Sequence, residues 1–262
     1  MKSNNKSYKT NNISKFYSVS RNKWRQFYES EKKVISDCNI NSRMRVLDIG
    51  CGCGGLGSAL QDRFGIRKYS GVEINSKAYM MAKVMLPAGI FLQGDFLAMP
   101  IQKFEKNGYH AVISLGCIDW NIEFNRMFAK AWKLVRPSGY MIISLRLTAE
   151  RTIQSIRSSY QYINFQMKKK GEKAPYHVLN AREVGQKFAK LNPSRLMAYG
   201  YWGKPSATAC TPFTKVCFSV FALQKKPKRA MTRKSKGHRL RLPLLIRHLL
   251  QKGIAANNPS FS

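Results

Sequence analysis

The chain has 262 residues, 44% of them hydrophobic, which is enough for one large folded domain with short appendages. It contains no run of about 18 apolar residues, so we expect no membrane-spanning helix. Its formal net charge of +33 favours polyanionic partners such as RNA, DNA or an anionic lipid surface, but a soluble enzyme from a lysine-rich proteome would carry the same excess.

The six cysteines are scattered and none forms a C-x-x-C pair, so neither a zinc ribbon nor a thioredoxin-type motif is indicated. The first residues lack the apolar segment of a secretory signal. We therefore expect a cytoplasmic protein with reduced thiols.

Three zones differ in composition. Residues 1–20 are rich in Asn, Ser and Lys, which predicts a flexible leader. Residues 21–224 alternate strand and helix patterns and form the predicted domain. Residues 225–262 carry 11 Lys or Arg and no acid, which predicts a basic, disordered tail. Within this tail, apolar and basic residues alternate over 240–250, a pattern typical of a short amphipathic helix that begins near Pro243.

In the middle zone, apolar periodicity predicts both strands and helices. We expect strands at 44–49, 69–74, 89–93, 111–115, 140–145, 195–202 and 215–223. We expect helices at 24–35, from 56 to about 64, 76–85, 124–132, over most of 148–170, and at 180–191. Short apolar strands that alternate with helices predict an α/β fold: a doubly wound, mostly parallel, seven-stranded sheet with helices on both faces.

A glycine-rich turn, Asp48-Ile-Gly-Cys-Gly-Cys-Gly-Gly55, lies between the first of these strands and the following helix. Such a loop lets the backbone approach a nucleotide-like ligand and aims helical N–H groups at its polar end. The chain is therefore predicted to bind an adenosine-containing cofactor. Taken alone, the turn also fits the dinucleotide fingerprint, with Glu73 as the ribose-binding acid.

Two further motifs separate these readings. Together with the turn 48–54, the segments Gly71-Val-Glu-Ile74 and Gly94-Asp-Phe96 resemble the three motifs of the class I S-adenosylmethionine-dependent methyltransferases. The resemblance covers about 24–224 and includes the closing pair of strands. It implies a Rossmann-like methyltransferase fold, methyltransferase activity and S-adenosylmethionine as the cofactor.

The resemblance also implies roles for residues at the strand ends. Glu73 would accept hydrogen bonds from the ribose hydroxyls, and Asp48 would orient the amino-acid end of the cofactor. Asp95 would accept from the adenine amino group, while Phe96 or Ile74 packs on the ring. The implied cofactor-binding set is Asp48, Gly50, Cys51, Gly52, Gly54, Glu73, Ile74, Asp95, Phe96 and Leu115.

The family faces its substrate after the fourth strand, where this chain has Asp119. We expect Asp119 to orient or deprotonate an acceptor hydroxyl or amine, with an N-cap of the next helix as the equally weighted alternative. An insertion over 148–194 is predicted to form a substrate lid. The substrate and lid candidates are Trp24 and Tyr28 from the leading helix, together with Trp120, Arg146 and His177.

Missing motifs narrow the chemistry further. No Asp/Asn-Pro-Pro-aromatic segment follows the fourth strand, which counts against methylation of the adenine amino group. Cys117 is preceded by Gly116 where cytosine-C5 enzymes carry proline, so it is interpreted as structural. The metal set of catechol-type enzymes is not evident, and we expect no metal.

Three functions remain at this point. The first is methyl transfer to a hydroxyl or amine of a small molecule, such as a sugar or secondary metabolite. The second is RNA methylation, which the charge favours. The third is a cofactor-binding scaffold without transfer activity. The sequence does not determine the oligomeric state.

Overall fold

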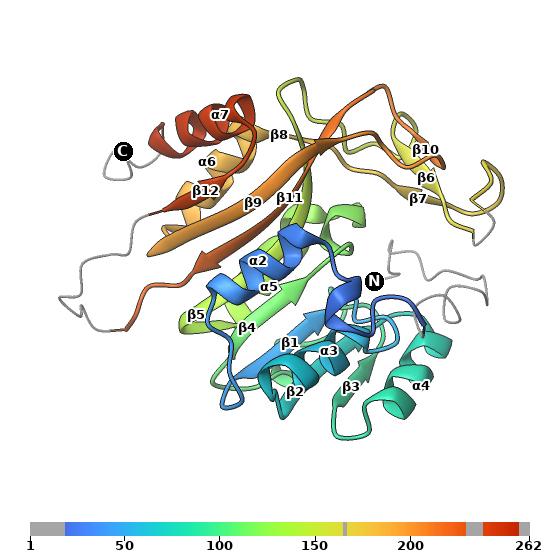
Figure 1. Ribbon diagram of the computed structural model, residues 1–262, viewed down its shortest axis with the longest axis vertical. Helices are drawn as coiled ribbons and strands as arrows, with labels where there is room; N and C mark the ends of the chain where they lie inside the picture. The colour runs from blue at the N-terminus through green and yellow to red at the C-terminus, as the bar shows by residue number, and fades with distance from the viewer. Residues whose placement is uncertain (1–18, 165–166, 229–237, 257–262) are drawn as a thin grey trace.

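The structure is a computed structural model and describes residues 19–164, 167–228 and 238–256. Its main sheet has the strand order β12-β9-β11-β5-β4-β1-β2-β3, and β8 pairs with β5 beside this path (Figure 1). The strands are β1 Arg45–Ile49, β2 Lys68–Glu73, β3 Ile90–Gln93, β4 Tyr109–Ser114, β5 Val135–Thr148, β8 Leu179–Asn180, β9 Arg195–Gly203, β11 Val216–Gln224 and β12 Arg239–Arg241.

Most neighbouring strands in this sheet are parallel, and only β11 runs antiparallel to its neighbours β5 and β9 among the described pairs. All seven predicted strands are present, so the doubly wound, mostly parallel sheet is confirmed. The strands β8 and β12 extend it beyond the prediction. A second, antiparallel sheet joins β6 Tyr160–Tyr162, β7 Lys173–Pro175 and β10 Ala209–Cys210.

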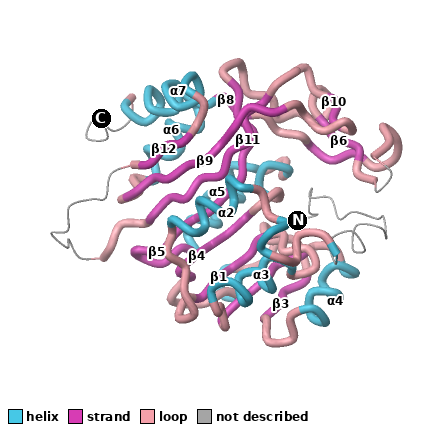
Figure 2. The backbone as a smooth tube through the Cα atoms, viewed as in Figure 1, coloured by secondary structure: helices cyan, strands magenta, loops and turns pink. Residues whose placement is uncertain are grey.

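Helices cover both faces of the main sheet (Figure 2). One face packs against α2 Glu29–Asp37 and α3 Gly55–Phe64, and the other against α5 Phe124–Leu134, α6 Ala181–Leu191 and α7 Leu244–Ala255. The helix α4 Ser76–Met85 packs beside α3 near the sheet edge. Strand β5 shows why the sheet is apolar on both sides: Met141 and Ile143 join one core cluster, while Ile142 joins the other.

The leading helix differs from its prediction. Instead of one helix over 24–35, a short 3₁₀ turn at Trp24–Gln26 is followed by extended backbone at Phe27, and α2 begins only at Glu29. The Glu31 carboxylate accepts the Tyr28 N–H at 2.9 Å, which satisfies a donor at the new helix start. The apolar periodicity over 24–35 therefore spans two separate helical segments, and it does not mark the break at Phe27.

The helix predicted over most of 148–170 is wrong. Strand β5 extends to Thr148, Ile153 forms an isolated bridge with Val178, and Ser155 opens a turn before β6. The aromatic alternation Tyr160-x-Tyr162 suits a strand better than a helix, because both rings then lie on one side and pack edge to face at 5.5 Å. The predicted lid segment 148–194 also includes α6, which packs in the main core and is not part of an appended unit.

The predicted disordered tail is corrected for residues 238–256. Strand β12 pairs in parallel with β9, and α7 follows Pro243, where the sequence placed the start of an amphipathic helix. The apolar side chains Ile246, Leu250 and Ile254 recur every four residues and join the main core, so this face of the helix is covered by α6. Residues 229–237 and 257–262 of this tail, and 1–18 of the predicted leader, lie outside the described residues.

No helix within the described part of the chain is both long and apolar enough to cross a membrane.

The α6–α7 contact depends on two glycines. A Cβ at Gly253 would overlap the Arg182 carbonyl oxygen, and one at Gly185 would overlap the Leu250 carbonyl oxygen. We predict that Gly253→Ala lowers the free energy of unfolding by about 1–3 kcal/mol, since overpacking against backbone outweighs the better helix propensity of alanine. Urea unfolding measures this loss. The neighbouring exposed change Lys252→Ala serves as the control, and equal midpoints for both variants would contradict the prediction.

Candidate active site

The glycine turn folds as the sequence predicts. It follows β1 with left-handed backbone at three positions, where φ is +75° at Gly50, +55° at Gly52 and +79° at Gly54. The N–H groups of Gly50 and Cys51 donate to the Val72 carbonyl oxygen at 2.9 and 3.1 Å. A side chain at Gly50 would meet the Cys117 side chain, so glycine is required both by φ and by space.

Cys117 is a packing residue in this arrangement. Burial raises the pKa of its thiol, and the neighbouring carboxylates of Glu73, Asp119 and Asp48 raise it further. A protonated thiol is a poor nucleophile, which agrees with the structural interpretation of this residue.

Glu73 connects the end of β2 to the glycine turn. Its carboxylate accepts the Gly52 N–H at 2.9 Å and the Asn75 N–H at 2.8 Å. Burial raises the pKa of Glu73, while its hydrogen bonds from backbone N–H groups lower it. A carboxylate has about four acceptor positions, so two backbone bonds leave capacity for ligand hydroxyls. The fold thus fits the ribose role, which stays a prediction.

Asp48 has a partner that the motif did not indicate. The Tyr69 hydroxyl donates to its Oδ2 at 2.6 Å, and the carboxyl is buried beneath the turn. Burial raises the pKa of Asp48 to about 7, although Tyr69 and the nearby Arg21 act in the opposite direction. Tyr69 lies near the start of β2, far from the strand end where the motif is read, so only strand pairing reveals it.

The adenine-side candidates separate into two groups. Gly94 donates its N–H to the Glu73 carbonyl at 2.8 Å, and Asp95 accepts the Leu97 N–H at 3.0 Å. Ile74 is half-buried beside them. Phe96, by contrast, is only 4% exposed and packs edge to face on Phe104 in the core. The prediction that Phe96 packs on the adenine ring is therefore corrected, and Ile74 is the remaining candidate.

Open space lies beyond the end of β4. Leu115 is partly buried there, and the next residue, Gly116, has φ +64° with no atom within 4 Å of where a Cβ would stand. The Gly116 N–H donates to the Ser144 hydroxyl at 2.7 Å, and this bond holds the backbone in place three residues before Asp119. The strand end predicted to face the substrate therefore borders a space that the described residues leave open.

Asp119 and Arg146 form a buried ion pair. Arg146 Nη2 lies 3.2 Å from Asp119 Oδ2 and donates to the Asp119 carbonyl at 2.9 Å, while Nε donates to the His177 carbonyl at 3.0 Å. The guanidinium also lies over the rings of Trp120 and Tyr176, at 4.7 and 4.0 Å from their centroids. The N-cap of α5 is Glu123, so the capping alternative for Asp119 is wrong.

Two of the substrate candidates are corrected by this cluster. Arg146 directs its donors at Asp119 and His177 and is 5% exposed, so it does not bind an external anion. His177 has no exposed surface and does not face an open site. Burial and the Arg146 charge lower the pKa of His177 to about 4, so the ring is neutral at physiological pH. Trp120 is half-buried and packs edge to face on Tyr176.

The same cluster contains buried polar atoms that lack a hydrogen bond within the described residues. They are Asp119 Oδ1, the Tyr176 hydroxyl and both ring nitrogens of His177. Buried polar atoms in native proteins are nearly always satisfied, and leaving one unpaired costs about 1–3 kcal/mol. Asp119 Oδ1 is therefore a place where a ligand or a water molecule would complete the bonding. Sequence reasoning found Asp119 but assigned Tyr176 no role at the site, because no motif includes it.

The leading segment covers the site differently from its prediction. Trp24 packs on Phe64 at the far end of α3, so it does not lie over the cofactor edge. Tyr28 is 61% exposed. The backbone of Arg21 instead crosses the first turn of α3, where a Cβ at Gly55 would overlap the Arg21 carbonyl oxygen. Arg21 pairs with Glu31 at 2.9 Å and was missed because its segment reads as polar and unpatterned.

No group of three or more His, Cys, Asp or Glu side chains within the described ranges is arranged to hold a metal ion.

Parts of the chain are similar in sequence to known methyltransferases. Residues 46–139 match the family model described as "Methyltransferase domain". Phosphoethanolamine N-methyltransferase from Plasmodium falciparum is 30% identical over 121 residues, 44% of each chain. Phthiotriol/phenolphthiotriol dimycocerosates methyltransferase 1 from Mycobacterium ulcerans is 28% identical over 103 residues, 38% of this chain and 37% of that protein. The chain thus spans less than half the length of the curated relatives it matches.

Solved structures share the fold. Phosphoethanolamine N-methyltransferase 2 from Haemonchus contortus superimposes with a TM-score of 0.54 at 12% identity, covering 82% of this chain and 60% of that one. A SAM-dependent methyltransferase from Thermotoga maritima gives a TM-score of 0.50 at 17% identity, covering 82% and 96%. The Rossmann-like methyltransferase fold expected from the sequence is therefore confirmed.

The raised pKa of Asp48 predicts a pH-dependent stability. The folded chain keeps a proton on Asp48 up to about pH 7, whereas the group ionises near 3.8 when unfolded, so stability from this site is lost as the pH rises between these values. An Asp48→Asn variant lacks this loss. The free energy of unfolding of Asp48→Asn minus that of the natural chain should increase by about 1–3 kcal/mol as the pH rises from about 5 to about 8. Urea titrations at several pH values measure the difference, and parallel pH profiles would contradict it.

Proposed function

We propose that this chain, whose residues 46–139 match a methyltransferase-domain model, transfers a methyl group from S-adenosylmethionine to a small molecule, and that the acceptor is an amine. The observation that carries the proposal is the position of Asp119. This buried carboxylate, one oxygen of which has no hydrogen-bond partner in the described part of the chain, follows β4 at the same sheet edge as the glycine turn and Glu73.

The residues at this edge fit the cofactor. The three left-handed glycines leave room for close backbone approach, and Glu73 keeps acceptor capacity for the ribose hydroxyls. Asp48 would hold the cationic amino group at the other end. When bound, S-adenosylmethionine supplies an electrophilic methyl group on a positively charged sulfur. Asp48, Glu73 and the turn bind and orient it, and alignment alone can contribute about 7–11 kcal/mol to the rate of such a displacement.

The acceptor side favours an amine. Asp119 Oδ1 has no partner among the described residues, and an amine N–H would donate to it, while Arg146 holds Oδ2 and fixes the carboxylate. An amine attacks through its lone pair and must release a proton. Burial raises the pKa of Asp119, with Arg146 acting against this, which suits a group that accepts a proton. The match to a phosphoethanolamine N-methyltransferase supports an amine ahead of a sugar.

RNA methylation and a cofactor-binding scaffold without transfer activity are the two alternative functions, and each would give a different experimental result. Contacts to many RNA phosphates would make activity fall steeply with salt, whereas a small amine at a buried carboxylate responds less. A scaffold would bind S-adenosylhomocysteine and transfer no methyl group to any fraction. The net charge of +33 favours RNA, whereas the Asp119 carboxylate lies in a buried cluster with Arg146 and Tyr176.

We predict that Glu73→Gln weakens binding of S-adenosylhomocysteine by about tenfold to several hundredfold, because hydrogen bonds to a charged acceptor contribute about 1.5–3 kcal/mol each. Isothermal titration measures the affinity. The exposed Glu105→Gln makes the same chemical change far from the turn and should bind as the natural chain does. Unchanged binding by the Glu73 variant would remove this residue from the cofactor site.

We predict that Asp119→Asn lowers methyl transfer by about 10²–10⁴-fold while S-adenosylhomocysteine binding stays within about twofold, since general-base catalysis contributes in that range. Transfer of labelled methyl from S-adenosylmethionine is measured with phosphoethanolamine, ethanolamine and a fractionated lysate as acceptors. Thermal unfolding shows whether the variant is folded. Normal turnover by the variant would exclude Asp119, and label in ribonuclease-sensitive material would replace the small-molecule acceptor by RNA.

A further inference from the structure

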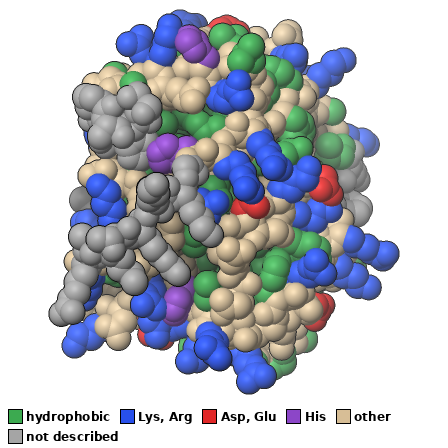
Figure 3. All heavy atoms as spheres, turned by 60° about the vertical axis from the view of Figure 1, so that its left-hand side comes forward, with side chains coloured by type: hydrophobic (Ala, Val, Ile, Leu, Met, Phe, Trp, Pro, Cys, Tyr) green, Lys and Arg blue, Asp and Glu red, His purple; other side chains and the backbone are tan. Residues whose placement is uncertain are grey.

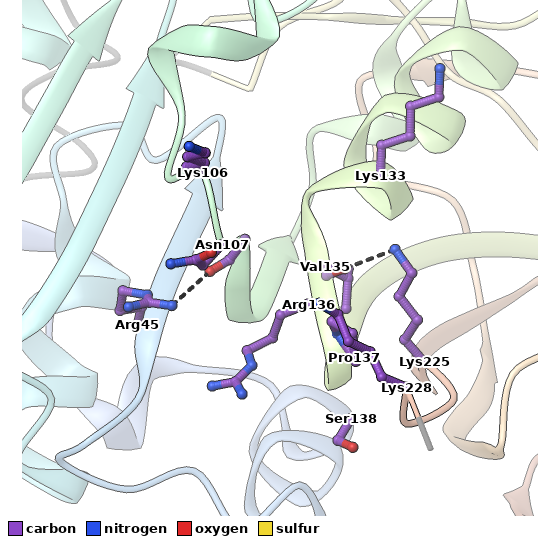
Figure 4. Close-up of a pocket in the computed structure, with 11 residues that line it drawn as sticks. Arg45, Lys106, Asn107, Lys133, Val135, Arg136, Pro137, Ser138, Lys225 and Lys228 are labelled. Carbon is purple, nitrogen blue, oxygen red and sulfur yellow. Dashed lines mark hydrogen bonds between the residues drawn. The ribbon is translucent and has the colours of Figure 1, made fainter. Parts of the chain in front are cut away.

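A cavity lies at the opposite edge of the main sheet from the glycine turn. It has a volume of about 670 Å³ and is bordered by the first residue of β1, the residues just before β4, the end of α5 with the start of β5, and the residues after β11 (Figure 4). The carboxyl ends of β1 and β2 carry the cofactor motifs, so a ligand in this cavity would not touch them. The volume is within the usual range for small-molecule sites, about 300–1,000 Å³.

Cations dominate the lining of this basic cavity, and none of its lining residues is Asp or Glu. The histidine beside it, His110, contributes no negative charge, and burial together with the charges of Arg136 and Arg45 lowers its pKa. The positive charge of the lining is therefore not neutralised by any residue of the lining itself. The six cationic residues are Arg45, Lys106, Lys133, Arg136, Lys225 and Lys228.

Three of these cations are held in place by the fold. Lys225 Nζ donates to the Trp132 and Val135 carbonyls at 3.1 and 2.8 Å, and burial lowers its pKa. Arg45 Nη2 donates to the Gly108 carbonyl at 3.3 Å. Arg136 contacts the His110 ring through Nη1. These bonds use only some of the available N–H donors, because a guanidinium has five and an ammonium three.

The other three cations, Lys106, Lys133 and Lys228, make no side-chain hydrogen bond or ion pair with the described residues, and each is exposed. Lys and Arg side chains also outnumber Asp and Glu on the face shown in Figure 3, as the 46 Lys and Arg against 13 Asp and Glu of the chain lead one to expect. The cavity thus has three cations that contact the fold, Arg45, Arg136 and Lys225, and three exposed lysines, which we call the rim lysines.

We propose that this basic cavity binds a compact anion that carries two or more phosphate groups, either a free polyphosphorylated molecule or a lipid head group. Arginine forks and lysine ammonium groups are the side chains that bind phosphate most strongly. A compact cavity with six cations suits phosphates clustered on one small molecule, whereas a nucleic acid backbone needs an extended basic track.

The test measures binding of inorganic tripolyphosphate by isothermal titration. The rim variant Lys106→Gln/Lys133→Gln/Lys228→Gln is compared with the control Lys190→Gln/Lys204→Gln/Lys252→Gln, which removes the same charge from exposed lysines elsewhere. We expect the rim variant to bind at least about tenfold more weakly and the control within about twofold of the natural chain, since loss of direct charge-assisted contacts exceeds screened long-range effects. Both variants should bind S-adenosylhomocysteine normally, which separates this site from the methyltransferase site.

Further arms identify the source of the phosphates. Vesicles of phosphatidylcholine with phosphatidylinositol 4,5-bisphosphate should retain the natural chain and the control more than the rim variant if a lipid head group is bound. Binding of tripolyphosphate without vesicle retention assigns the site to a free ligand. Equal loss in both triple variants, no binding of either probe, or a single-stranded RNA that binds more tightly than tripolyphosphate would overturn the proposal.

Discussion

The site depends on one contact between segments 21 residues apart, in which the Glu73 carboxylate accepts the Gly52 N–H. This bond fixes the glycine turn to the end of β2, and the parallel pairing of β1 with β2 brings the two into register. The turn can approach so closely only because Gly50 leaves space that the Cys117 side chain fills. The same carboxylate thus has a structural role toward the backbone and a proposed role toward the ribose, so a change at Glu73 acts on both.

The proposed acceptor side is organised around an internal cation. Arg146 lies over the rings of both Trp120 and Tyr176 and pairs with Asp119, so a cation is already held against aromatic faces here. Because the guanidinium contacts only one carboxylate oxygen, the pair holds Asp119 in place while the other oxygen has no partner among the described residues. A buried ion pair of this kind contributes little net stability, so its value here lies in positioning.

Charge is distributed unequally over the two edges of the sheet. The chain has 46 Lys and Arg against 13 Asp and Glu, yet four carboxylates, from Asp48, Glu73, Asp95 and Asp119, lie at or just beyond the carboxyl ends of β1 to β4. The proposed ligands there, a sulfonium cofactor and an amine, are cations. The opposite edge carries the cavity lined by six cations, which suits anions. Four of the 13 acidic residues of this strongly basic chain thus lie where cations are proposed to bind.

The sequence by itself determined the parts that depend on local chemistry. Glycine at 50, 52 and 54 specifies left-handed backbone, apolar alternation specifies the buried strands, and the motif spacing places Glu73 and Asp95 at strand ends. Only the tertiary structure decided which distant groups meet. It paired Tyr69 with Asp48, turned Arg146 inward to Asp119, placed Phe96 in the core, and folded residues 238–256 onto α6 and β9. The physical reason is that backbone conformation is set by neighbours in sequence, whereas burial and partner choice are set by strand order, which no single segment contains.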